Sequence, residues 1–135
     1  MRYSTTLVEH FRNPRNVGMM QNPDAVGEDE YGGCGDVVRF YLRVRDGKVA
    51  EARFQTYGCG PTIAAASVGS ELATGRAVEQ VLDLTAADVE AAVDGLPDDR
   101  RHAADIVRGA LLAAARDYLG RQSAAVASGG GVQRV

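Results

Sequence analysis

The sequence predicts a small α+β domain, and two patterns support this fold class. Polarity alternates through residues 37–45 and 50–55, on either side of Asp46-Gly47, which predicts an antiparallel hairpin with one face in water. Apolar residues then recur at helical spacing through residues 103–118. The chain of 135 residues is long enough for one domain and too short for two ordinary ones.

The N-terminal part of the chain is expected to hold one short helix and a long loop. Ser4 is a suitable N-cap, and the helix it begins ends before Pro14. Residues 15–33 lack periodicity and contain Asn, Pro, Asp and Gly, which is typical of a loop. The residue pattern therefore predicts the two hairpin strands and does not decide whether there is a third strand.

Helices are expected to fill the rest of the domain. Pro61 suits a first helical turn, Thr85 and Asp88 resemble a capping box, and Gly120 is expected to end the last helix. The predicted helical segments are residues 61–74, 77–82, 85–95 and 96–120.

The end of the chain has little to bury. Residues 123–135 contain three consecutive glycines, which predicts a disordered tail after a single domain of residues 1–122.

Charge and hydropathy exclude two classes of partner. A net charge of -3 argues against electrostatic binding of nucleic acid. The longest apolar run, residues 110–115, is far shorter than the roughly 20 residues of a membrane span. The first residues lack the apolar core of a secretory signal, so we expect a cytoplasmic protein.

Four side chains stand out as candidate metal ligands. Cys34 precedes the first hairpin strand and Cys59 follows the second, so the hairpin brings both to one end of the sheet. Asp36 lies beside Cys34 in sequence, and His102 begins the last helix, with Asp105 placed to fix its tautomer. These residue types ligate soft and borderline metals.

Spacing alone leaves other interpretations open. A cysteine is often a small buried hydrophobe, Asp36 is also a suitable turn residue, and an isolated His102 is typical of a solvated first turn. The four side chains together allow a mononuclear Zn²⁺ or Fe²⁺ site, while the cysteines alone allow a thiol-based sulfur-transfer protein. His10, Tyr3 and Tyr57 are interpreted as structural. Because no nucleophile–base pair is evident, we do not expect an enzyme.

Several separate stretches resemble the IscU/NifU-type iron–sulfur cluster scaffold family. They are residues 10–18 (HFRNPRNVG), 34–36 (CGD), 52–60 (ARFQTYGCG), and Leu96-Pro97 followed by His102. The resemblance implies a SufE/IscU-like α+β fold, with about three antiparallel strands, helices packed on one face and a solvent-facing cluster site. It also implies a [2Fe–2S] cluster that is built with sulfur from a cysteine desulfurase and passed to apo acceptor proteins.

By this resemblance, the candidate ligands correspond to the family's cluster site. Cys34 and Cys59 match two of its three cysteines, Asp36 its aspartate linked to cluster lability, and His102 its histidine. The residue after His102 would be the third cysteine and is Ala103 here. The chaperone segment Leu-Pro-Pro-Val-Lys reads LPDDR at residues 96–100, which leaves recognition by an Hsp70-type chaperone in doubt.

Without the third cysteine, one chain still offers four terminal ligands for a cluster. Two thiolates, a carboxylate and an imidazole supply the four terminal ligands of a [2Fe–2S] cluster, and the harder carboxylate favours a labile one. Alternatively, Cys34 and Cys59 from each chain of a homodimer supply four thiolates. Zinc would also bind these ligands readily. Because Ala103 cannot accept persulfide sulfur, we hypothesise a protein that holds or relays a cluster but assembles one poorly from free components.

Overall fold

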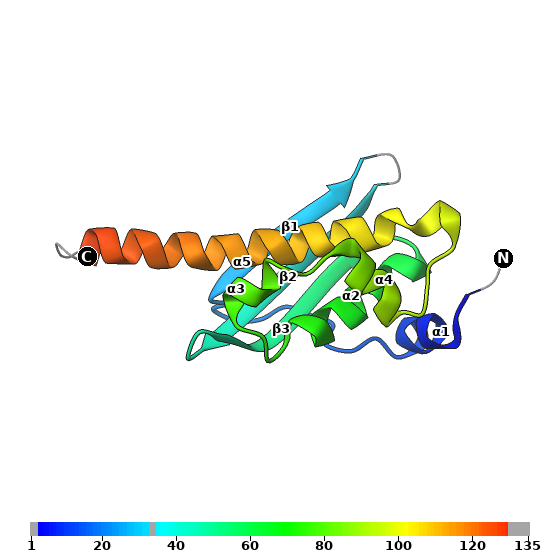
Figure 1. Ribbon diagram of the computed structural model, residues 1–135, viewed down its shortest axis with the longest axis horizontal. Coiled ribbons are helices and arrows are strands. Elements are labelled where there is room, and N and C mark those ends of the chain that lie inside the picture. Colours follow the sequence, from blue (N-terminus) through cyan, green and yellow to red (C-terminus); the bar gives the residue numbers. More distant parts are fainter. Residues whose placement is uncertain (1–2, 33–34, 130–135) are drawn as a thin grey trace.

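A three-stranded antiparallel sheet with helices packed on one face forms the domain, as the family resemblance implies (Figure 1). The computed structural model describes residues 3–32 and 35–129. The strands are β1 (Ala25–Tyr31), β2 (Asp36–Arg45) and β3 (Lys48–Tyr57), in the order β1-β2-β3. The helices are α1 (Thr5–Arg12), α2 (Gly60–Ala73), α3 (Val78–Val81), α4 (Ala86–Ala92) and α5 (His102–Gly129), with a 3₁₀ turn at Asp98–Arg100.

The β2–β3 hairpin forms where the alternation of residues predicts it. Asp46 and Gly47 both have positive φ, 53° and 75°, which is the requirement of a type I′ turn. Along the strands, Phe40 pairs with Phe54, and both rings are fully buried beneath the helices. The hairpin therefore sets one apolar face against the helical layer.

The predicted loop over residues 15–33 is wrong for residues 25–31, which form β1. This strand carries Glu28, Asp29 and Glu30 in succession, so its sequence shows no alternation of apolar residues. It is held instead by β2 on one side and by α5, where Asp117 Oδ2 accepts a hydrogen bond from the Val26 amide at 2.9 Å. Tertiary contacts, rather than local sequence preference, make this segment a strand.

The α5 helix is longer than the sequence predicts. It continues through Gly120 to Gly129, because one glycine inside a helix costs only about 1 kcal/mol and the surrounding residues favour a helix. Residues 123–129 are therefore helical where a disordered tail was expected, and residues 130–135 lie outside the described residues. The helix begins at His102 rather than at residue 96, since residues 98–100 form the separate 3₁₀ turn.

A buried histidine joins α1 to α2. His10 is only 8% exposed, its Nδ1 lies 2.7 Å from Ser67 Oγ, and its Nε2 lies 3.7 Å from a Glu71 oxygen. Burial, and then the positive charge of Arg15, lower the pKa of His10 below its usual 6.5. His10 therefore supports the fold as a neutral imidazole, in keeping with its structural interpretation.

We expect the folded state to lose stability as the pH falls below about 6.5. There the unfolded chain takes up a proton on His10 that the folded chain still resists, so the free energy of unfolding falls by at most about 1.4 kcal/mol per pH unit. Urea unfolding of wild type and His10→Gln at pH 7.5 and 5.5 measures this effect. The variant should lack the His10 part of the slope, and equal slopes for both proteins would contradict the prediction.

Candidate functional site

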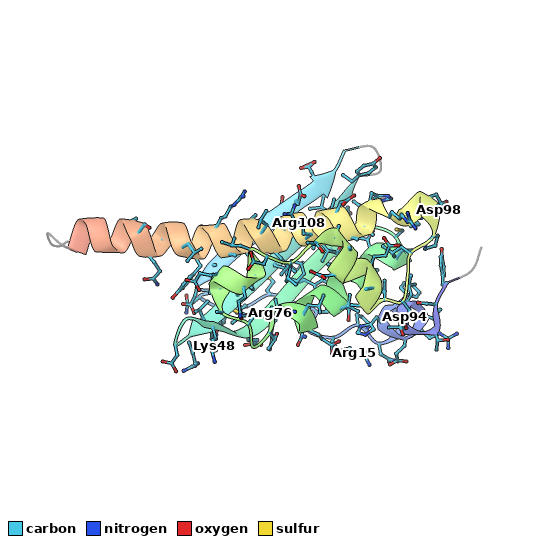
Figure 2. The ribbon with its side chains drawn as sticks, viewed as in Figure 1. Arg15, Lys48, Arg76, Asp94, Asp98 and Arg108 are labelled. Carbon is cyan, nitrogen blue, oxygen red and sulfur yellow. The ribbon has the colours of Figure 1, made fainter. Side chains whose placement is uncertain are left out.

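Three elements meet at the end of the sheet that lies away from the hairpin turn. Asp36 begins β2, Cys59 is the N-cap of α2, and His102 is the first residue of α5. In Figure 2, Asp98, just before α5, and Lys48, at the hairpin turn, lie at opposite ends of the sheet region. The chain thus places residues 36, 59 and 102 beside one another although they are distant in sequence.

The carboxylate of Asp36 is the centre of this group. Its Oδ2 lies 3.2 Å from His102 Nε2, accepts a hydrogen bond from Thr62 Oγ1 at 2.9 Å, and lies 3.9 Å from Cys59 Sγ. Cys59 Sγ is also 3.3 Å from Thr62 Oγ1. Of the four predicted ligands, the structure brings together Asp36, Cys59 and His102, whereas Cys34 lies outside the described residues.

These polar groups are largely withdrawn from solvent. The side chains of Asp36 and His102 are 7% and 14% exposed, and Thr62 is fully buried. A buried carboxylate is tolerated only when hydrogen bonds replace its water, and Thr62 and His102 supply them here. In the described part of the chain, the carboxylate bound to His102 is therefore Asp36 and not the expected Asp105.

Two residues of the site escaped the sequence analysis. Tyr31, at the end of β1, stacks on the His102 ring with centroids 4.4 Å apart, and Thr62 bonds Asp36. The spacing of Cys59 and Thr62, three residues apart at the start of a helix, was a signal that the two share a face. Tyr31 gave no such signal, because it lies in a segment that was expected to be a loop.

A glycine leaves room for the Asp36 carboxylate. A Cβ atom on Gly58 would lie 3.0 Å from Asp36 Oδ1, closer than side-chain carbons normally approach. Gly58 thus leaves space beside Oδ1 of the carboxylate, while Thr62 and His102 contact Oδ2.

Two surface pockets share Cys59 as a lining residue. One of about 220 Å³ is lined by Asp36, Cys59, Arg100 and His102. The other, of about 270 Å³, is mainly apolar and is lined by Tyr3, Leu7, Val8, Phe11, Cys59, Gly60, Pro61 and Arg100. Cys59 therefore lines both a pocket with charged side chains and an apolar surface hollow.

The two tyrosines interpreted as packing residues are not core residues. Tyr57 is 80% exposed and Tyr3 is 44% exposed, so the packing interpretation is wrong for Tyr57 in particular. Tyr57 ends β3 and lines a surface hollow of about 300 Å³ together with Glu28, Val37, Arg39, Gln55 and Thr56.

The described residues of the site are not arranged to enclose a metal ion. Within residues 3–32 and 35–129, no three His, Cys, Asp or Glu side chains are already arranged to hold one metal ion. The direct contact between Asp36 and His102 occupies atoms that a metal would need. The donor set of thiol, carboxylate and imidazole nevertheless suits iron or zinc once that contact opens.

Comparison with known proteins identifies the family. The profile of the NifU-like N-terminal domain matches residues 2–125. The chain belongs to this family. The iron–sulfur cluster assembly scaffold protein IscU 1 of Archaeoglobus fulgidus is 38% identical over 116 residues, which cover 86% of this chain and 76% of that protein. The IscU scaffold protein of Escherichia coli is 35% identical over 128 residues, covering 92% and 99%.

A solved structure agrees on the fold. The N-terminal part of a nitrogen-fixing NifU-like protein from Brucella abortus superposes with a TM-score of 0.55 at 23% identity, covering 90% of this chain and 83% of that one. The family profile and the curated relatives confirm the family of iron–sulfur cluster assembly scaffolds expected from the sequence motifs. Scaffolds of this family are not enzymes, in agreement with the sequence analysis.

No helix in the described ranges combines the length and the apolar character needed to cross a membrane.

Proposed function

We propose that this NifU-like domain binds a labile [2Fe–2S] cluster as cargo and passes it to acceptor proteins. The observation that supports the proposal is the convergence of Asp36, Cys59 and His102 from three elements at one end of the sheet. In the proposal, Cys34 supplies the fourth terminal ligand. The names of the relatives, which are iron–sulfur cluster assembly scaffold proteins, support an iron–sulfur cluster as the cargo.

The proposed ligands favour release of the cargo. A carboxylate binds iron less covalently than a thiolate, so Asp36 weakens one of the four attachments. The Asp36–His102 contact offers both side chains a partner when the cluster leaves. A cluster held in this way exchanges more readily than one held by four thiolates.

The proposed partners and compartment are those that the family resemblance and the sequence suggest. Sulfur comes from a cysteine desulfurase, the cluster goes to apo iron–sulfur proteins, and the protein works in the cytoplasm. The acidic Asp98-Asp99 within residues 96–100 argues against an Hsp70-type chaperone as the agent of release.

Anaerobic reconstitution with iron and sulfide tests the proposal. We expect wild type to hold about two iron and two sulfide ions per chain. Cys34→Ala and Cys59→Ala should lose most of both, and His102→Ala should lose cluster faster to a chelator. Ser70→Ala is the matched control, because it removes a buried hydroxyl from α2 away from the site and should reconstitute like wild type.

The iron and sulfide contents per chain also distinguish between the competing interpretations. About one iron and one sulfide per chain, lost with either cysteine but not with His102→Ala, would indicate a cluster shared by a homodimer. Colourless protein that binds only zinc would favour the mononuclear site, because a [2Fe–2S] cluster absorbs visible light. Sulfur transfer that survives a chelator would favour the thiol-based alternative.

A further inference from the structure

A single buried hydroxyl contacts two of the proposed ligands. Thr62 has no exposed surface, donates a hydrogen bond to Asp36 Oδ2 at 2.9 Å, and holds its Oγ1 3.3 Å from Cys59 Sγ. Sequence motifs did not single out this residue, and the proposed ligand set does not include it.

The position of Thr62 is fixed by its backbone and by its branched side chain. Its amide donates to the Cys59 carbonyl at 3.0 Å in the first turn of α2, so the two residues are tied together. A β-branched residue has few χ1 rotamers in a helix, and the rotamer that Thr62 adopts is the one whose hydroxyl donates to Asp36 Oδ2. Gly58 has no Cβ atom and so leaves room for the other oxygen of Asp36, Oδ1, which a larger side chain there would crowd.

Binding of a metal by His102 Nε2 would break the contact between His102 and Asp36. His102 Nε2 lies 3.2 Å from Asp36 Oδ2, and the imidazole must leave that oxygen before the same nitrogen can ligate. The Thr62 hydroxyl then remains as a hydrogen-bond donor to the buried carboxylate. Without it, Asp36 would be free to rotate away from Cys59.

We propose that Thr62 is a positioning residue for the cargo's metal, which orients the Asp36 carboxylate and keeps it beside the Cys59 sulfur. This inference rests on the proposed function, because it takes Asp36 and Cys59 as ligands. Partners that orient a metal ligand typically change metal affinity by about 10- to 100-fold when they are removed.

Binding of Zn²⁺ alone tests the role of Thr62. The full chain, reduced and free of metal, is titrated against a chromophoric chelator to obtain Kd. Thr62→Val keeps the shape but removes the hydroxyl, and should weaken Zn²⁺ binding by about 10- to 100-fold. Thr62→Ser restores the hydroxyl and should return the affinity to that of wild type.

A double-mutant cycle shows through which ligand Thr62 acts. In an Asp36→Ala background, Thr62→Val should have no further effect on Kd, because the carboxylate that it orients is gone. Co²⁺ in place of Zn²⁺ gives a spectroscopic signature of the ligand geometry, and Thr62→Val should alter that spectrum while Thr62→Ser does not. A purely structural role would lower the melting temperature without changing the spectrum.

Two controls keep the result interpretable. Ser70→Ala removes another fully buried hydroxyl from α2 and should leave Kd unchanged. Should Thr62→Val fail to fold, Thr62→Ala removes the hydroxyl without adding bulk and carries the same test.

The outcomes separate this inference from the proposed function. Wild type that binds no Zn²⁺, or that binds it as well after Cys59→Ala, overturns both. Wild type that needs Cys59 and Asp36, with Thr62→Val binding equally or more tightly, overturns the role of Thr62 alone. Failure of Thr62→Ser to restore affinity does the same.

Discussion

Replacing Gly27 with alanine should destabilise the domain by about 3 kcal/mol, because β1 then loses its close approach to α5. A Cβ atom at position 27 would lie 2.6 Å from the Ala114 Cα, and the obstacle is helix backbone that cannot rotate away. The strand or the helix must therefore move. Urea unfolding measures the change, and hydrogen exchange of the β1 amides shows whether this strand is the part that loosens.

The matched control for this prediction is Gly120→Ala. Position 120 is also a glycine, lies within α5, and has open space around its missing side chain. Alanine there should stabilise the domain by about 0.5–1 kcal/mol, since glycine is the poorer helix former. Equal effects at the two positions would show that the clash at Gly27 does not matter.

The Gly27 prediction also bears on the site. The β1 strand ends at Tyr31, whose ring stacks on His102, and its partner in the sheet is Asp36. Displacing β1 should therefore disturb two groups of the candidate site at once. In Gly27→Ala, we expect weaker Zn²⁺ binding even under conditions where most of the protein stays folded.

Installing a thiol after His102 should speed desulfurase-driven cluster assembly by about tenfold or more, a change of about 1.4 kcal/mol in the activation barrier. Ala103 offers no sulfur, so transfer in wild type relies on other groups, and we hypothesise that this limits assembly. Ala103 is fully buried, but it lies in the first turn of α5, where helices fray most readily. Wild type and Ala103→Cys are compared with desulfurase, iron and cysteine, following visible absorption.

Ala104→Cys is the control for the position of the new thiol. Ala104 is the next residue of the same helix and is 1% exposed, so both variants add one buried sulfur. Only Ala103→Cys should assemble cluster faster. If neither variant is faster than wild type, a missing thiol at position 103 is not what limits assembly.

Much of the fold was predictable because its signals are local. The alternation through residues 37–45 and the Asp46-Gly47 turn predict the hairpin, and the spacing of apolar residues predicts α5. β1 was missed because its neighbours, not its own residues, make it a strand. The end of α5 was missed because Gly120 inside a long helix costs less than the rest of the helix gains.

The candidate site divides in the same way. Residue type and hairpin geometry were enough to single out Cys34, Asp36, Cys59 and His102 as candidates, and the motifs around them were enough to indicate the family. Only the tertiary structure decided which atoms meet: the Thr62 hydroxyl on Asp36, the Tyr31 ring on His102, and Asp36 instead of Asp105 as the partner of the imidazole. The sequence shows which possible ligands the chain contains. Contacts between distant segments depend on how strands and helices pack, and no local sequence pattern encodes that packing.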